Sequence, residues 1–155
     1  MQAPYILSTE GRLASPMLEN GGNQSNYFHV HPPLYYLVLA VVFKLFGFGV
    51  VQARMLSLLF SLGSLFLLYK ICRLEYEDSS FFARRVTMLM LSTPLFFVLS
   101  KTIRPESMML FLCLLLYFFF KKYYECNRLK DLFVGSVISS LLLLTHFYGA
   151  FLIET

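Results

Sequence analysis

The chain has 155 residues, of which 57% are hydrophobic and only 14% charged, and its mean hydropathy is +0.64. Soluble globular domains carry about 25% charged residues, so this composition excludes an ordinary soluble domain and indicates an integral membrane protein. The net charge of +4 does not indicate a nucleic-acid-binding protein, because the basic residues flank apolar runs and no nucleic-acid recognition motif is present.

The N-terminal segment is predicted to lie at the membrane surface. Residues 1–26 are mixed and polar, without the basic start and apolar stretch of a secretion signal. Within this segment Tyr5–Leu18 is amphipathic, and we expect its first part to be helical and the helix to be broken at Pro16.

The first strongly apolar run, Leu34–Phe46, follows two prolines and is closed by Gly47. It is too short to span a hydrocarbon core of about 30 Å. The run therefore predicts a re-entrant or interfacial helix that begins just after Pro33.

Four later apolar runs are candidates for membrane crossings, at about residues 53–70, 85–101, 106–122 and 132–153. The first three are short and can span only if the flanking Lys and Arg side chains extend to the headgroups. The predicted fold class is an all-α polytopic membrane protein with about four transmembrane helices plus outer-face juxtamembrane helices. Residues 1–52 are assigned to an outer-face region and residues 53–155 to the helical bundle.

The charges of the connections predict the orientation of this bundle. The connections after the first and third crossings are rich in Lys and Arg: Lys70, Arg73, Arg84, Arg85, Lys121, Lys122, Arg128 and Lys130. Basic connections stay in the cytoplasm. By parity the N-terminal region and the turn at residues 104–106 lie on the outer side.

This topology gathers several ionisable residues at the outer face, namely His29, His31, Lys101, Arg104, Glu106 and His146. Ionisable groups at a membrane surface beside a tight proline turn indicate a functional site. The alternative interpretation is that Lys101 and Arg104 anchor the chain at the headgroups, and that Glu106 only stabilises a helix N-terminus.

Four motifs in order extend this interpretation: HPPLYY at 31–36, FKLFG at 43–47, SKTIRPE at 100–106 and LTHFYG at 144–149. With them the chain resembles the membrane glycosyltransferases of the protein O-mannosyltransferase superfamily, which includes the bacterial aminoarabinose lipid A transferases. The resemblance covers nearly the whole chain and suggests the N-terminal part of a larger enzyme.

The resemblance implies transfer of a sugar from a polyprenyl- or dolichyl-phosphate donor to a lipid, glycan or protein acceptor, with inversion at the anomeric carbon. The transfer would take place at the outer face of a multi-pass protein, with the plasma membrane of a bacterium or archaeon as the expected location. The implied partners are the lipid-linked sugar, its acceptor and membrane lipids, and do not include nucleic acid.

One part of the family pattern is missing. The first outer loop of the family carries Asp followed by Glu shortly before a Tyr, and this acid acts as general base on the acceptor. If Tyr5 is that Tyr, the pair falls near Met1 and Gln2, which have no carboxylate. This departure predicts a fragment that is inactive alone, or a remnant without this chemistry. Glu10 and Glu19 are weaker substitutes for the missing acid.

The other family roles fall on residues present in the chain. The resemblance assigns donor-phosphate binding to Tyr5, His31, Lys101 and Arg104. It assigns Glu106 to the second acidic position, a catalytic residue that orients the acceptor or an ion.

His29 and His146 are further possible site residues. The spacing of His29 and His31 suits a metal pair, but no third ligand is evident nearby. The three cysteines are too widely spaced for a metal knuckle. No cofactor is therefore assigned, and a divalent metal remains open.

The competing hypothesis is a non-enzymatic membrane protein, such as a transporter component or an assembly subunit. Buried polar groups midway along the crossings would favour transport. The crossings contain no mid-span charge. Their only polar groups of this kind are serines, namely Ser57, Ser61, Ser64, Ser136, Ser139 and Ser140. The clustering of charge at one face favours the transferase.

Overall fold

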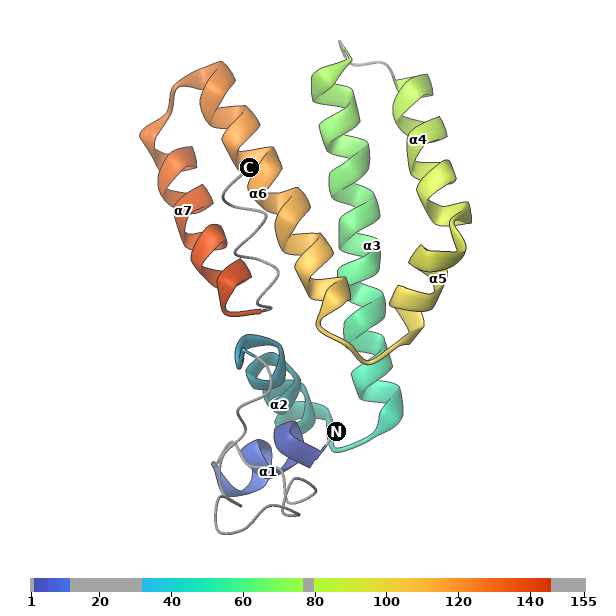
Figure 1. Ribbon diagram of the computed structural model, residues 1–155, viewed down its shortest axis with the longest axis vertical. Coiled ribbons are helices and arrows are strands. Elements are labelled where there is room, and N and C mark those ends of the chain that lie inside the picture. Colours follow the sequence, from blue (N-terminus) through green and yellow to red (C-terminus); the bar gives the residue numbers. More distant parts are fainter. Residues whose placement is uncertain (1, 12–31, 77–79, 146–155) are drawn as a thin grey trace.

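A computed structural model describes residues 2–11, 32–76 and 80–145 of the chain (Figure 1). These residues form α-helices and no strands, which confirms the all-α fold class. The helices are α1 (Gln2–Glu10), α2 (Leu34–Phe46), α3 (Val50–Glu75), α4 (Ser80–Ser92), α5 (Pro94–Lys101), α6 (Glu106–Cys126) and α7 (Leu129–Leu143).

Two of these helices, α3 and α6, are long and apolar enough to cross a membrane. The pair α4–α5 passes the same test together but is bent by 68°, so that there are two or at most three candidate spans among the described residues. Helix α7 has 15 residues and ends at Leu143, and residues 146–153 of the predicted crossing at 132–153 lie outside the described residues. The count of four crossings therefore stays a prediction.

The bundle has two distinct ends (Figure 1). The chain rises along α3, descends along α4 and α5, rises along α6 and descends along α7. The end of α3, the start of α4 and the α6–α7 connection lie at one end, here called the Glu75 end. The α5–α6 connection lies at the other, the Glu106 end, together with the start of α3 and helices α1 and α2. The two predicted basic loops thus share the Glu75 end.

Helix α2 has the predicted bounds. It follows Pro33 and ends at Gly47, whose φ of 82° suits a residue without a side chain. The Leu34 N–H donates to the Leu144 carbonyl at 3.0 Å, so α2 starts against the end of α7, and Figure 1 places it beneath the bundle. Its buried face carries Tyr35 and Leu39. That α2 lies along the bilayer stays a prediction.

Helices α3 and α6 approach each other closely at small residues. A Cβ on Gly63 would lie 2.7 Å from the Phe111 ring on α6. Ser61 and Ser64 are also buried on α3, and Ser61 borders a cavity on the α5 side. Their hydroxyls donate to carbonyls one turn earlier, at 2.9 and 2.8 Å. Small residues permit such contact where lipid supplies no hydrophobic drive between helices, so packing holds this pair together.

The run predicted as one crossing at 85–101 is instead broken at Pro94. Proline lacks an N–H and its ring clashes with the preceding turn, which forces the residue before it into an extended conformation. Thr93 has a ψ of 123°, and its N–H donates to the Met90 carbonyl at 3.1 Å, three residues back. Because of this bend, the axis of α5 points in a different direction from the axis of α4.

Candidate functional site

The α5–α6 connection is the tight turn that the sequence predicts. Helix α5 ends at Lys101, Thr102 is extended with a ψ of 143°, and α6 begins at Glu106. Pro105 has a φ of −66°, which suits entry into a helix, and its carbonyl accepts the Met109 N–H at 2.9 Å. The fold thereby brings Lys101 and Glu106 into one short segment.

Glu106 has two unlike oxygens. Its Oε1 lies 3.6 Å from Arg104 Nη1, and the Arg104 side chain is 69% exposed. Its Oε2 is buried and accepts no hydrogen bond from any described residue. Buried carboxylate oxygens nearly always have a donor, so this oxygen is suited to accept one from a bound hydroxyl or water.

The buried Tyr35 hydroxyl lies near this carboxylate and next to the buried Ser57 hydroxyl. Neither Tyr35 Oη on α2 nor Ser57 Oγ on α3 makes a hydrogen bond of good geometry within the described residues. Burial, the largest cause, raises the pKa of the Tyr35 phenol; the neighbouring Ser57 hydroxyl opposes this shift, and the Glu106 carboxylate adds to it. We call Tyr35, Ser57 and Glu106 the polar junction, since they come from three helices.

Tyr36 adds a second phenol near the junction. Burial raises its pKa, and the Glu106 carboxylate raises it further. Both phenols therefore stay protonated well above neutral pH and remain hydrogen-bond donors. A carboxylate acceptor beside hydroxyl donors is the polar environment that a sugar or another polyhydroxyl compound requires.

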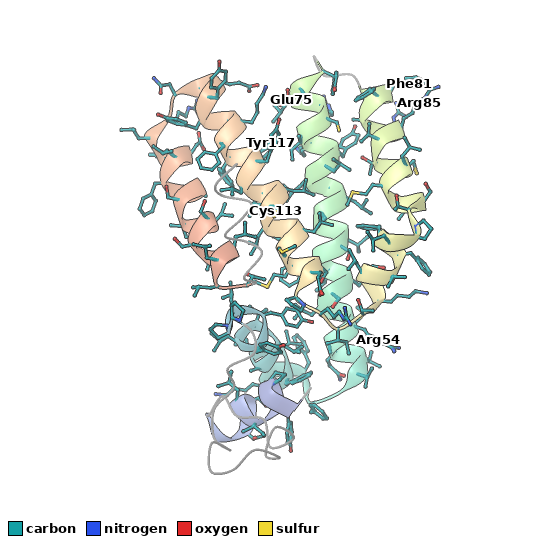
Figure 2. The ribbon with its side chains drawn as sticks, in the orientation of Figure 1. Arg54, Glu75, Phe81, Arg85, Cys113 and Tyr117 are labelled. Carbon is teal, nitrogen blue, oxygen red and sulfur yellow. The ribbon has the colours of Figure 1, made fainter. Side chains whose placement is uncertain are left out.

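An apolar groove opens beside the same end. A cavity of about 400 Å³ lies between α3 and the bent α4–α5 pair. Its lining is Val51, Arg54, Met55, Leu58, Ser61, Leu62, Leu65, Leu91, Phe96, Phe97, Ser100 and Lys101. Arg54 lies at the Glu106 end (Figure 2), and Lys101 Nζ lies 3.8 Å from the centre of the Phe97 ring. The α3–α5 groove is thus apolar along its length and cationic at one end.

The other predicted site residues are not assembled by the described part of the chain. The Tyr5 ring packs on Phe48, with centroids 4.6 Å apart, beside the α2–α3 connection, and its predicted role stays a prediction. His29, His31 and His146 lie outside the described residues, as do Met1 and Glu19, and the Glu10 side chain is not described. Within the described ranges, no three His, Cys, Asp or Glu residues could hold a metal ion together.

A comparison with known protein families shows which family this chain belongs to. A family model described as dolichyl-phosphate-mannose-protein mannosyltransferase matches residues 30–154. The chain belongs to this family. The match confirms the resemblance to the superfamily and implies a mannosyltransferase-like glycosyltransferase that uses a polyprenyl-phosphate sugar donor. Comparisons with curated proteins and with solved structures gave no significant match.

Two members of the polar junction were missed by sequence reasoning. Tyr35 belongs to the HPPLYY motif, but its neighbour His31 drew the functional assignment. Ser57 was counted only as a mild polar residue within an apolar run. No sequence spacing marks either position, because Tyr35 and Ser57 join the junction only through the packing of α2, α3 and α6 in the folded chain.

Proposed function

We propose that the Glu106 end binds the lipid-linked sugar donor and its acceptor, and that an inverting transfer takes place there at the outer face. The observation that carries this proposal is the conjunction of the polar junction with the cationic end of the α3–α5 groove. A sugar needs hydroxyl and carboxylate partners, a phosphate needs cations and a prenyl chain needs an apolar groove. All three environments occur at one end of the bundle.

The groove is proposed to hold the prenyl chain of the donor. Its wall on α3 runs from Val51 to Leu65, which at 1.5 Å per residue is a length of about 21 Å. A chain in this groove would bring its phosphate to Arg54 and Lys101. Arg104, on the adjoining turn, is exposed and able to join them.

The chemical step follows from these positions. The Glu106 carboxylate accepts the proton of the acceptor hydroxyl, and the acceptor oxygen attacks the anomeric carbon from the side opposite the phosphate. The bond between the anomeric carbon and the phosphate oxygen breaks, and the leaving polyprenyl phosphate keeps the electron pair. Arg104 and Lys101 stabilise the charge that grows on that phosphate. The configuration at the anomeric carbon is therefore inverted.

The positive-inside rule supports the assignment of this end to the outer face. The basic connections share the opposite, Glu75 end, and basic connections remain in the cytoplasm. Labelling of single cysteines introduced at Arg104 and Arg128 in sealed cells tests this topology. We expect a membrane-impermeant reagent to label the residue at 104 and to leave the residue at 128 unlabelled; the reverse pattern would exclude transfer at the outer face.

Donor binding tests the groove. The chain, purified in lipid nanodiscs, is titrated with polyprenyl-phosphate mannose and with a short-chain analogue that keeps the sugar phosphate. A Leu58→Trp substitution places bulk in the groove and is expected to weaken the long-chain donor severalfold while leaving the short-chain analogue unchanged. Leu59→Trp, on an exposed position of the same helix outside this groove, is the matched control. Equal effects of the two substitutions would refute the assignment of the prenyl chain to this groove.

A further inference from the structure

The Glu75 end contains a second cavity, which the transfer chemistry does not use. It has a volume of about 370 Å³ and lies between the ends of α3 and α6. Its lining is Lys70, Arg73, Leu74, Phe118, Lys122, Glu125 and Cys126. Three cations and one carboxylate therefore surround a small apolar floor.

The charged residues in and around this cavity, here called the basic pocket, differ in whether they form ion pairs. Lys121, which lies outside the pocket lining, donates to Glu75 at 3.0 Å and contacts Glu125 at 3.5 Å. Glu125 is thus already shared with another cation. Within the part of the chain that the structure describes, neither Lys70 nor Lys122 forms an ion pair.

The two lysines are arranged alike on their helices. Lys70 Nζ lies 5.5 Å from the centre of the Phe66 ring, one turn deeper on α3. Lys122 likewise follows Phe118, which forms part of the pocket, by one turn on α6. Lys70 thus lies above an exposed aromatic ring, and Lys122 lies one helical turn after an aromatic residue of the pocket.

From this arrangement we infer that the basic pocket binds the headgroup of one anionic phospholipid. The phosphodiester would lie between Lys70 and Lys122, with an acyl chain leaving along Leu74 and Phe118. Basic pockets between helix ends at the cytoplasmic surface suit such headgroups, and each cation contributes about 1 kcal/mol of attraction. The inference rests on the pocket and its charge and takes the cytoplasmic placement of the Glu75 end from the proposed topology, but it does not depend on the transfer chemistry.

Native mass spectrometry of the chain in detergent tests this inference with dioleoyl phosphatidylglycerol as the probe. We expect retention of one phosphatidylglycerol, and none of dioleoyl phosphatidylcholine under the same conditions. The double variant Lys70→Gln/Lys122→Gln should weaken binding about thirtyfold, since two cations are removed. Lys70→Arg/Lys122→Arg keeps the charges and should retain the lipid.

The matched control removes two charges from the same end but outside the pocket. Arg128→Gln/Lys130→Gln changes exposed residues at the start of α7, and binding should change less than twofold. If this control weakens binding as much as the pocket variant, the attraction belongs to the whole basic surface and the inference is wrong. Equal binding of phosphatidylcholine would also overturn it.

A competition experiment with a soluble phosphate compound distinguishes a lipid-binding site from a site for free anions. Glycerol phosphate at millimolar concentration should neither displace phosphatidylglycerol nor raise the melting temperature of the wild-type chain. Displacement by glycerol phosphate would identify a site for free phosphate compounds and would contradict the lipid assignment. Because wild-type protein suffices for this arm, its outcome does not depend on whether the variants fold.

Discussion

The two ends of the bundle each contain a glutamate at a helix boundary, but the two carboxylates differ in how fully they are bonded. Glu75 accepts the Tyr117 hydroxyl at 2.7 Å through Oε1 and Lys121 Nζ at 3.0 Å through Oε2, and Figure 2 shows Glu75 and Tyr117 together between α3 and α6. Glu106 has a long contact to an exposed arginine, and its second oxygen has no donor among the described residues.

This difference distinguishes a structural carboxylate from a functional one. A satisfied network fixes two helices relative to each other, whereas a buried oxygen without a donor among the described residues is able to accept a hydrogen bond from a bound group. Both glutamates lie in a basic neighbourhood, so charge alone does not separate them. The two carboxylates differ instead in how many of their oxygens are bonded, which substitution of each glutamate tests.

The largest expected effect comes from Glu106→Gln. The amide keeps the shape but cannot take a proton, so sugar transfer should fall by a hundredfold or more, on the order expected for loss of a general base. Transfer is measured in membranes from cells that express the protein, with polyprenyl-phosphate mannose as donor. The melting temperature should change little, because Glu106 has few partners to lose. Unchanged transfer would reduce Glu106 to a stabiliser of the α6 N-terminus.

Arg104→Gln should have a smaller effect, which appears in donor binding. Loss of one cation near a phosphate weakens binding by about 1 kcal/mol, or about fivefold. The dissociation constant is measured by titration of the chain in nanodiscs. Arg85→Gln is the matched control, because Arg85 lies on α4 at the opposite end and its guanidinium stacks 4.0 Å from the centre of the Phe81 ring. Equal losses for the two variants would indicate a general surface attraction.

Glu75→Gln should affect stability and leave transfer within twofold of wild type. The substitution removes the charge that Lys121 contacts and weakens the bond from Tyr117, so the melting temperature should fall by on the order of a few degrees. Tyr117→Phe should show a smaller fall, and the double variant should fall less than the sum, because both residues act in one network. A strong loss of transfer without loss of stability would contradict the comparison of the two ends.

The smallest expected effect is that of Gly135→Ala, which is compared with Gly63→Ala because the two glycines differ in the space around them. A Cβ on Gly135 would meet the Phe120 ring at an ordinary 3.6 Å, whereas a Cβ on Gly63 would meet Phe111 at 2.7 Å. Gly135→Ala should stabilise the chain by about 0.5–1 kcal/mol through helix propensity, and Gly63→Ala should destabilise it by about 1–3 kcal/mol through overpacking. Both are measured by thermal unfolding, and neither should alter donor binding.

Part of the fold follows directly from the sequence. Prolines and glycines set the bounds of α2 and the start of α6, because their backbone restrictions act locally. The predicted crossing at 53–70 lies within α3, and the helix itself is longer and runs from Val50 to Glu75, since a charged residue such as Arg54 can remain helical with its side chain exposed. The bend at Pro94 was missed, although the proline was visible, because apolar composition alone indicated an uninterrupted crossing.

The candidate site was predicted only in part. The turn that contains Lys101, Arg104 and Glu106 is contiguous in sequence, so its residues could be placed together in advance. The contacts that bring Tyr35 and Ser57 to Glu106 depend on how three helices pack, and no spacing in the chain encodes them.

The most direct test of the account is to locate the donor by photo-crosslinking. A polyprenyl-phosphate mannose analogue with a diazirine on its sugar is bound to the chain in nanodiscs, irradiated and mapped by peptide mass spectrometry. The account predicts adducts at the α5–α6 turn and the polar junction, residues 101–107, 35–36 and 57. Excess unlabelled donor should abolish them. Adducts concentrated at the Glu75 end, around residues 70–75 and 117–125, would contradict the account.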